Sequence, residues 1–357
     1  MADIYINNGD ELFAMTRELL DASGAARLFA AGQCVLVKPN LVVEKPPSEG
    51  ATTHPEIVEA IIVFLRELGV TDIVIAEGSG VGNDTTRAFS VCGYDRLASG
   101  YGVRLLNTQK DEVRTVEVAG HSLGICAAAL DADAIVNVPV LKGHCQTWLT
   151  CCLKNLKGLI PDREKRRYHT LGIHDPVAAL NMAVRPQLHV VDAVCGDRTY
   201  EEGGTPVQTD QILLGFDAAL IDSYAATLLG YAPEEIGYLK RVCELGYGQY
   251  ADDSTEIVEF HKDRRRTAEL PNRDRVRQLA RHVDADEACS ICYALLISSL
   301  NRAGTPKHGE IIHIGQGFRG KKPGRYGSGD CCRGCDTYAP GCPPKSKDII
   351  AMLRGME

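Results

Sequence analysis

The sequence predicts an α/β fold with a mostly parallel sheet and helices on both faces. Short apolar, β-branched runs alternate with helical patterns over residues 1–250, as in chains that build parallel sheets. The length of 357 residues permits one large or two ordinary domains. We predict an α/β ligand-binding domain over residues 1–285 and a small C-terminal, cysteine-rich domain over residues 286–357.

Each predicted element rests on its apolar pattern and on the residues that end it. The predicted strands are 3–7, 33–40, 72–77, 103–106, 113–118, 134–141, 188–192 and 211–216. The predicted helices are 11–20, 55–69, 123–129, 145–157, 174–184, 218–229 and 233–244. Residues 163–169 are predicted as a charged loop, and the charge-dense residues 254–281 as a linker or exposed helical connector.

Composition limits the classes of function. The apolar content of 45% and the charged content of 24% are ordinary for a soluble globular protein. A net charge of −8, with no basic, aromatic-rich surface, argues against nucleic acid as the main partner. No apolar stretch is long enough to span a bilayer, and the N-terminus has no signal-peptide pattern. We therefore expect a cytoplasmic protein with no membrane partner, which could form a homodimer.

The stretch 134–161 carries the candidate chemistry. A buried strand ends at Leu141, and Lys142 and His144 follow where α/β sheets bind ligands. The helix expected next would direct its free N–H groups at the same place. From Lys142 to Arg167 there are seven Lys or Arg residues and two acids. The pattern predicts a pocket for a small anionic ligand, and a solvated basic helix face is the alternative.

Other polar residues at strand ends and helix starts are expected to join this pocket. His144 is the candidate proton-transfer residue, because histidine titrates near neutral pH. Lys154 is the candidate for binding or polarising an anionic group. The glycine-rich turn 78–82 and the acidic loop 195–209 are expected beside the pocket. The remaining candidates for anion binding are Lys38, Asn40, Thr53, His54, Glu77, Ser79, Lys142, Asn155 and Lys157.

The fourteen cysteines indicate thiols or metal ligands, since disulfides are rare in the cytoplasm. Cys289 and Cys292 form a C-x-x-C pair, and Cys342 precedes two prolines, as in cluster-binding runs that end in Cys-Pro. We predict a [4Fe–4S] cluster on Cys289, Cys292, Cys342 and one of Cys331, Cys332 or Cys335, with Cys331 favoured. A four-cysteine zinc site and free thiols are the alternatives.

Several short motifs stand out along the first part of the chain. They are Val37-Lys-Pro-Asn40, Thr52-Thr-His-Pro55, Ala76-Glu-Gly78, Asn137 to Lys142 with His144, Leu153 to Gly158, Val191-Asp-Ala193, and Asp217 with Asp222. Together they resemble the domain-of-unknown-function 362 family over about residues 30–245. Members of that family often carry iron–sulfur domains, and this tail resembles a non-ferredoxin version that ends in Gly-Cys-Pro-Pro. The family has no general assigned reaction.

A more distant resemblance is to the nickel-pincer lactate racemases. Their catalytic histidine and cofactor-carrying lysine have the spacing of His144 and Lys154. Thr150-Cys-Cys-Leu153 replaces the glycine-rich segment that precedes the racemase lysine. The resemblance therefore implies the fold and the place of the pocket rather than the nickel cofactor.

These observations predict an iron–sulfur redox enzyme that acts on a small anionic substrate or cofactor. Its electron donor would be a protein such as ferredoxin or flavodoxin. One alternative is an isomerase-like or racemase-like enzyme with a structural cluster. Another is an electron carrier or cluster-assembly partner without catalysis of its own.

Overall fold

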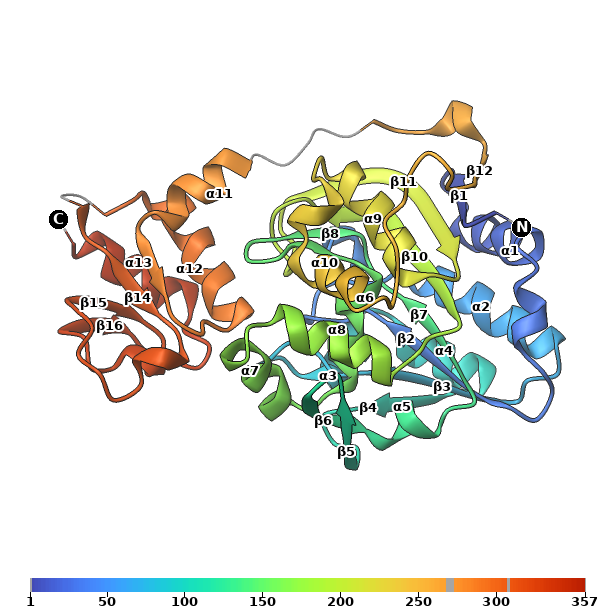
Figure 1. The fold of residues 1–357 in the computed structure, drawn as a ribbon, viewed down its shortest axis with the longest axis horizontal. Helices are drawn as coiled ribbons and strands as arrows, with labels where there is room; N and C mark the ends of the chain where they lie inside the picture. Colours follow the sequence, from blue (N-terminus) through green and yellow to red (C-terminus); the bar gives the residue numbers. More distant parts are fainter. Residues whose placement is uncertain (1, 268–272, 307–308, 357) are drawn as a thin grey trace.

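The computed structural model describes residues 2–267, 273–306 and 309–356. Its main feature is one eight-stranded sheet with helices on both faces (Figure 1), so the predicted fold class is confirmed. The strands of this sheet are β1 (Ile4–Asn8), β2 (Cys34–Pro39), β3 (Asp72–Glu77), β4 (Arg104–Asn107), β7 (Ala134–Val138), β10 (Leu188–Asp197), β11 (Pro206–Gly215) and β12 (Ile257–Phe260).

The strand order is β12-β1-β11-β10-β7-β2-β3-β4. Only β11 runs antiparallel to its neighbours, and the other pairs are parallel. The chain proceeds from β2 through β3 to β4 and then returns to place β7 on the other side of β2. This reversal creates a topological switch point between β2 and β7, where open α/β sheets bind ligands.

Helices bury two apolar clusters, one on each face of the sheet. In α2, Ile57, Ile61 and Leu65 recur at every fourth position and are fully buried, so each contributes roughly 1.5–3 kcal/mol. One face is covered by α1 (Leu12–Ala22), α2 (Pro55–Glu67), α3 (Thr85–Val91) and α4 (Tyr94–Tyr101). The other is covered by α5 (Ala127–Asp131), α6 (Cys152–Asn155), α7 (Asp162–Thr170), α8 (His174–Ala183), α9 (Ala218–Leu228) and α10 (Gly237–Glu244).

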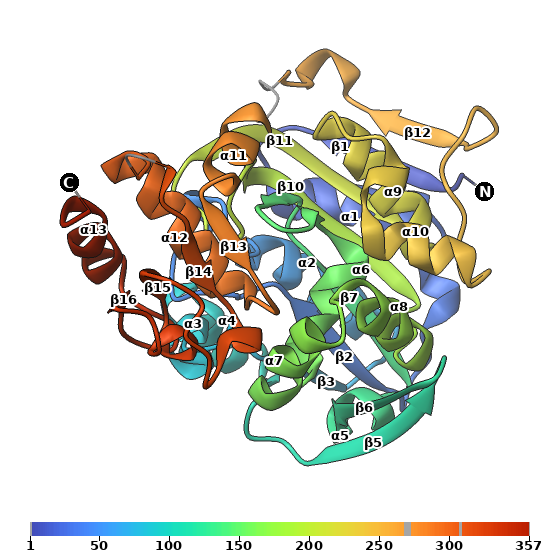
Figure 2. The same ribbon diagram turned by 60° about the vertical axis from the view of Figure 1, so that its left-hand side comes forward.

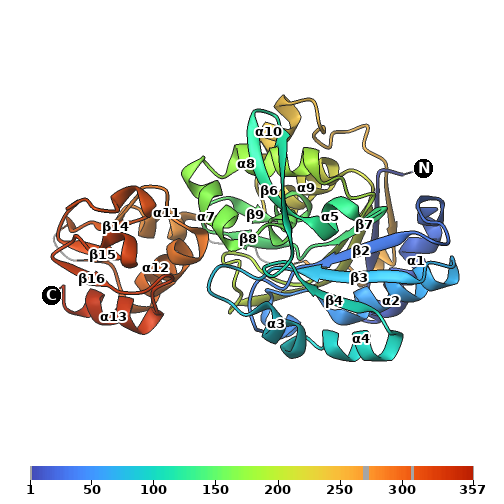
Figure 3. The same cartoon turned by 90° about the horizontal axis from the view of Figure 1, so that it is seen from below.

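A second, four-stranded parallel sheet lies to one side of the first (Figure 3) and has its own apolar cluster. Its elements are α11 (Arg273–Ala280), β13 (Val283–Ala285), α12 (Ser290–Ala303), β14 (Ile312–Ile314), β15 (Tyr326–Ser328), β16 (Thr337–Ala339) and α13 (Ser346–Arg354). In Figure 2 these elements come forward, and α7 lies beside them. Because β13 belongs to this sheet, the sheet begins ahead of residue 286. The division of the chain into two domains stays a prediction.

The predicted helix over 145–157 is wrong for most of its length. Residues 142–150 form a hairpin of β8 (Lys142–His144) and β9 (Trp148–Thr150), and helix begins only at Cys152. The imidazole Nδ1 of His144 accepts the backbone N–H groups of Gln146 and Thr147 in the turn of this hairpin, whose strands pair Lys142 with Thr150 and His144 with Trp148. Trp148 has a φ of +65°, which lies outside the helical range.

Three other segments also differ from the predictions. Residues 163–169, predicted as a loop, belong to α7, which has two acids in its first turn and Arg167 and His169 in its last, as the helix dipole favours. The predicted helix 123–129 is largely β6 (His121–Cys126), which pairs with β5 (Val113–Val118). The predicted connector 254–281 contains β12 and α11, and its residues 268–272 lie outside the described part of the chain.

In the described part of the chain, no helix has both the length and the apolar character needed to cross a lipid bilayer.

Candidate functional site

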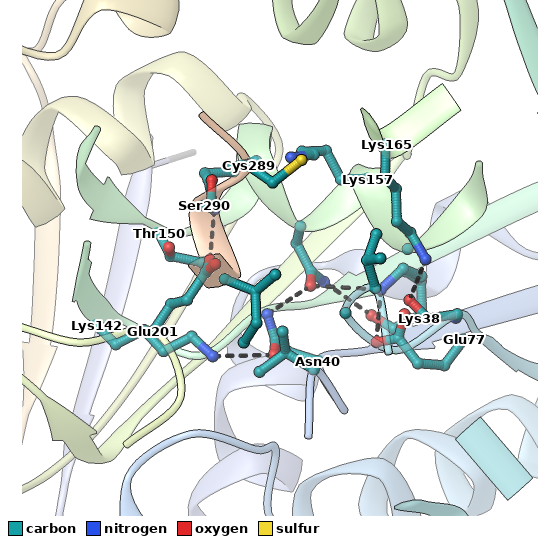
Figure 4. Close-up of a pocket in the computed structure, with 18 of the residues that line it drawn as sticks. Lys38, Asn40, Glu77, Lys142, Thr150, Lys157, Lys165, Glu201, Cys289 and Ser290 are labelled. Carbon is teal, nitrogen blue, oxygen red and sulfur yellow. Dashed lines mark hydrogen bonds and ion pairs between the residues drawn. The ribbon is translucent and has the colours of Figure 1, made fainter. Parts of the chain in front are cut away.

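A cavity lined by five lysines lies at the carboxyl ends of β2 and β3, beside the switch point. We call it the lysine cavity. It contains about 680 Å³ of space not filled by atoms, part of which opens to solvent. Its polar lining is Lys38, Asn40, Glu77, Lys142, Thr150, Lys154, Asn155, Lys157, Lys165, His169, Glu201, Cys289 and Ser290, and Figure 4 shows ten of these residues.

The floor of the cavity is a buried ion pair. Nζ of Lys38 lies 2.9 Å from Oε2 of Glu77, and both side chains are almost completely buried. The Glu77 carboxylate also accepts the backbone N–H groups of Leu41 and Gly78. A Cβ on Gly158 would lie 1.9 Å from Glu77 Oε1, so only glycine fits against this pair. Lys38 and Glu77 are therefore committed to holding the loops together.

A side-chain amide network adjoins this pair. Oδ1 of Asn155 accepts from Lys38 and from Nδ2 of Asn40, and Nδ2 of Asn155 donates to Oδ1 of Asn137. Oδ1 of Asn40 in turn accepts from Nζ of Lys142 at 3.1 Å. The network fixes Asn40 and Asn155 in orientation and leads from the floor to the second buried lysine.

Lys142 is fully buried and has no carboxylate within 4.0 Å among the described residues. Its ammonium donates to Asn40 and to the carbonyl of Ala51. Burial, reinforced by the nearby charge of Lys154, lowers the pKa of Lys142 to about 8. An anion bound nearby would favour the charged form.

Lys154, Glu201 and His144 form the third part of the wall. Oε2 of Glu201 lies 2.7 Å from Nζ of Lys154 and 3.0 Å from Nε2 of His144. Because Nδ1 of His144 accepts two backbone N–H groups, the proton of the neutral ring is on Nε2. Burial lowers the pKa of His144 to about 4. Burial also opposes ionisation of Glu201, but His144 and Lys154 hold the pKa of this carboxyl well below its ordinary value.

Lys157, Lys165 and His169 complete the cavity. Nζ of Lys165 donates to the carbonyls of Gly78 and Ser79 and is thereby engaged. Lys157 is only partly buried and has no carboxylate within 4.0 Å in the described ranges. Desolvation and the charge of Lys154 lower the pKa of Lys157 to about 7. Lys157 is therefore a cation of the cavity that lacks a protein counter-ion.

Three of the predicted anion-binding residues do not line the cavity. The hydroxyl of Thr53 donates to Val138 O and accepts the backbone N–H of Asn40. Nδ1 of His54 lies 2.8 Å from Oδ2 of Asp192, which also accepts the His54 backbone N–H. The hydroxyl of Ser79 donates to Leu41 O. These side chains support the loops around the cavity, and we do not include them among the residues proposed to bind a ligand.

The expected role of free helix N–H groups is also wrong. The carboxylate of Asp222 on α9 accepts the backbone N–H groups of Cys152 and Leu153, at 2.7 and 3.1 Å, so the start of α6 is satisfied by the protein itself. Burial raises the pKa of Asp222 to about 7. The ligand atoms of Cys151, Cys152 and Asp222 lie within 4.8 Å of one another, a group that could hold a metal ion.

The four predicted cluster ligands line one further small cavity, which we call the cysteine site. Cys289 is the N-cap residue of α12, and Cys292 lies in the first turn of that helix. Cys331 follows the last residue of β15 by three residues, and Cys342 follows the last residue of β16 by three. Because these last residues, Ser328 and Ala339, are register partners, the two cysteines occupy equivalent places after neighbouring strands. The backbone N–H of Gly341 donates to Oδ1 of Asp330 and joins the two loops.

The cysteine site fits a cluster better than a single zinc ion. Zinc holds sulfurs at about 2.3 Å and therefore within about 4 Å of one another. Among the described residues, no three of these cysteines bring their sulfurs within 4.8 Å of one another. Burial and the neighbouring Cys331 and Cys342 raise the pKa of Cys289 to about 11, and burial raises the pKa of Cys292 further. The raised pKa values of Cys289 and Cys292 disfavour their free thiolates, which a bound iron–sulfur group would stabilise.

Cys332 and Cys335 lie outside the cysteine site. Both are buried and pack in a small apolar cluster with Phe318. Their burial in this cluster favours Cys331 as the fourth ligand among the three candidates.

Cys289 lines both the lysine cavity and the cysteine site. Figure 4 shows it beside Lys157, and its thiolate would interact with the charge of that lysine. Next to it, the Ser290 backbone N–H donates to Nε2 of His169 at 3.4 Å. Nε2 of Gln316 donates to the backbone carbonyl of Arg166, and both of these residues line the cysteine site. The cysteine-rich segment thus closes one side of the lysine cavity.

Lys165, His169 and Arg166 were not among the predicted site residues, and Glu201 was included only within the acidic loop 195–209. The concentration of basic residues up to Arg167 is visible in the sequence. Because this segment was predicted as a loop, a helix α7 that faces the cavity was not expected. Nothing in the sequence indicated that Cys289 would reach the lysines.

The family model described as "Domain of unknown function (DUF362)" matches residues 35–227, more than half of the chain. A thylakoid-associated protein from Synechocystis is 27% identical over 226 residues, which cover 60% of this chain and 67% of that protein.

Two solved structures are similar at 14% identity. The lactate racemase apoprotein from Thermoanaerobacterium thermosaccharolyticum has a TM-score of 0.37, covering 52% of this chain and 50% of its own. A Thermotoga maritima protein from a structural genomics consortium has a TM-score of 0.40, covering 67% of this chain and 60% of its own. The chain thus spans half to three fifths of these solved chains.

Proposed function

This chain belongs to the DUF362 family, and we propose that it is an iron–sulfur redox enzyme acting on a small anionic substrate or cofactor. The observation that carries the proposal is that Cys289 is a wall of both the lysine cavity and the cysteine site. A site for a redox group and a site for a charged ligand thus share one side chain.

Cys289, Cys292, Cys331 and Cys342 would hold a [4Fe–4S] cluster, which supplies single electrons when bound. The half-buried Cys289 and Cys292 lie on the side of α12, and the exposed Cys342 lies on the side of the solvent. The chain's contribution is to keep a ligand in the lysine cavity next to Cys289.

The charges of the cavity support an anionic ligand. Five lysines line it against two carboxylates, Glu77 and Glu201. Lys38 is paired with Glu77 and Lys154 with Glu201, while Lys142 and Lys157 have no such partner in the described part of the chain. Burial, followed by the positive charge of Lys154, lowers the pKa values of these two lysines to about 8 and 7, and five lysines against two carboxylates leave an excess of cationic groups. A carboxylate or phosphate would relieve this excess by pairing with Lys157 and Lys154.

Glu201 is the residue we propose for proton transfer in the cavity. Its carboxylate is ionised, lines the cavity and is contacted by both Lys154 and His144. His144 does not line the cavity, so we assign it the task of positioning Glu201. This modifies the expectation that His144 itself acts on the ligand.

The electron-carrier alternative is less well supported, because a carrier requires no buried lysines beside its cluster. An isomerase requires an acid and a base on opposite sides of its substrate, whereas Glu201 and His144 lie on the same side.

The test uses anaerobically purified, dithionite-reduced protein freed of excess reductant. It is mixed with a panel of small carboxylates and phosphates, and the return of visible absorbance is followed. We expect at least one anion to reoxidise the wild type. Lys154→Met should lose most of this rate at equal iron content, whereas Lys110→Met, at an exposed residue that does not line the cavity, should keep it. A protein that contains only zinc, or equal rates in all three proteins, would contradict the proposal.

A further inference from the structure

The cysteine site has a buried side and an exposed side. Cys289 and Cys292 are partly covered by the main sheet and its loops, whereas Cys342 is exposed and Cys331 is half-exposed. Cys289 leads inward to the lysine cavity, so Cys342 marks the side from which another molecule could approach.

The surface around Cys342 is basic, although the whole chain has a net charge of −8. Residues 316–347 contain seven Lys or Arg and two Asp. The seven side chains belong to exposed residues: Arg319, Lys321, Lys322, Arg325, Arg333, Lys345 and Lys347. We call these residues the basic rim.

Contacts place several members of the basic rim close to the cysteines. Nε of Arg319 lies 3.4 Å from Sγ of Cys331. A Cβ on Gly334 would lie 2.0 Å from the carbonyl of Lys321, so the chain around Lys321 runs against that around Arg333. Lys345 follows Cys342 by three residues. Arg319 and Lys345 therefore lie on the exposed side of the cysteine site, and Lys321 and Arg333 lie on chain segments that run against each other.

Most of this charge is not neutralised by the protein. Lys321 lies 3.8 Å from Asp286, and Arg325 lies 3.2 Å from Glu310. The other five basic residues have no carboxylate within 4.0 Å in the described ranges of the chain. A surface of this kind attracts acidic partners over about a Debye length and speeds their association.

We infer that the basic rim is the docking surface for a small, acidic single-electron carrier protein. The inference rests on the proposed function, because it is the redox role of the cysteine site that calls for such a partner. Charge complementarity would orient the carrier with its redox centre facing Cys342. Nucleic acid is also acidic, but a nucleic-acid partner would not explain why an exposed cysteine site lies at the centre of the contact surface.

The experiment measures binding of an acidic [2Fe–2S] ferredoxin to full-length protein at 25 and 200 mM NaCl, and iron content is measured on the same samples. We expect the wild-type Kd to rise about tenfold over this salt range. Lys322→Glu/Arg333→Glu/Lys345→Glu should weaken binding at 25 mM NaCl by at least about tenfold, or roughly 1.4 kcal/mol.

Two variants make the result specific. The matched control Lys110→Glu/Lys240→Glu reverses two exposed charges far from the rim and should change Kd less than about twofold. The neutral variant Lys322→Gln/Arg333→Gln/Lys345→Gln should give an intermediate loss, which guards against misfolding of the charge-reversed protein.

Equal Kd values for rim and control variants would overturn the inference. So would tighter binding of a single-stranded oligonucleotide that the rim variant abolishes, because the rim would then serve nucleic acid. Iron content tests the proposed function, and Kd tests the docking surface. A result that contradicts one of the two proposals can therefore be told from a result that contradicts the other.

Discussion

The lysine cavity and the cysteine site are both built at the carboxyl ends of parallel strands, but they differ in how their charges are balanced. In the cavity, Lys38 and Lys154 have carboxylate partners at 2.9 and 2.7 Å, and amide or carbonyl groups hold Lys142 and Lys165. In the cysteine site the thiols have one another for neighbours, and Arg319 contacts Cys331. Most of the cavity lysines are thus held by the protein, whereas under the proposed function a bound cluster would stabilise the thiolates of the cysteine site.

This difference separates the residues that stabilise the fold from those that are available to bind a ligand or a cluster. Lys38 and Glu77 are structural despite lining the cavity, because their polar atoms are all engaged. Lys157 and the four cysteines are engaged far less, and they are the groups on which a ligand or a cluster would act.

The largest expected effect separates a structural charge from a site cysteine. Glu77→Ala leaves Lys38 buried without a counter-ion and should lower the free energy of unfolding by about 3–5 kcal/mol. Cys342→Ala, at an exposed position, should lower it by less than about 0.5 kcal/mol in metal-free protein. Denaturant unfolding of both variants checks this. Comparable losses would mean that the two sites contribute equally to the fold.

A smaller effect should appear as a pH dependence. The folded protein favours neutral His144, with a pKa of about 4, against an ordinary value of 6.5. The unfolded chain therefore binds more protons in this window, and stability is lost as pH falls from about 6.5 towards 4. The loss should reach roughly 3 kcal/mol relative to His144→Gln. His121→Gln, at the half-exposed start of β6, should follow the wild type. Parallel curves for wild type and His144→Gln would refute this reading.

The smallest effect concerns the contact between the two regions. Gly82 has a φ of +89°, and a Cβ there would lie 2.6 Å from Cδ of Pro343, which follows Cys342. Gly82→Ala should cost about 1–3 kcal/mol and also reduce iron retention, because Pro343 must move. Gly102→Ala has a similar φ of +63° with nothing within 4 Å of the new atom. It should cost about 1 kcal/mol and leave iron content unchanged. Equal iron content in both variants would mean that this contact does not support the cysteine site.

The sequence was sufficient for seven of the eight strands of the main sheet and for most of the polar residues that line the cavity. Buried strands can be recognised by their apolar runs. Polar residues at the ends of such strands must share one edge of a parallel sheet, as Lys38, Asn40 and Glu77 do. The cysteine spacing likewise identified the residues that line the cysteine site.

What could not be predicted depends on contacts between distant segments. The helical pattern over 145–157 failed before Cys152 because these residues pair in the β8–β9 hairpin, and the start of the helix that does form is capped by Asp222, which lies seventy residues later. Thr53 and Ser79 have side chains suited to anions, but nearby carbonyls accept their hydroxyl protons. The approach of Cys289 to Lys157 arises from packing of the second sheet against α7, for which no pattern along the chain gives a signal.

The most direct test is the metal content of the wild type and of six single Cys→Ser variants, purified without oxygen. The account predicts about four iron and four sulfide per chain in the wild type. Most of this iron should be lost in Cys289→Ser, Cys292→Ser, Cys331→Ser and Cys342→Ser, and it should be retained in Cys332→Ser and Cys335→Ser. One zinc per chain without iron, or loss of iron in Cys332→Ser or Cys335→Ser with retention in Cys331→Ser, would contradict it.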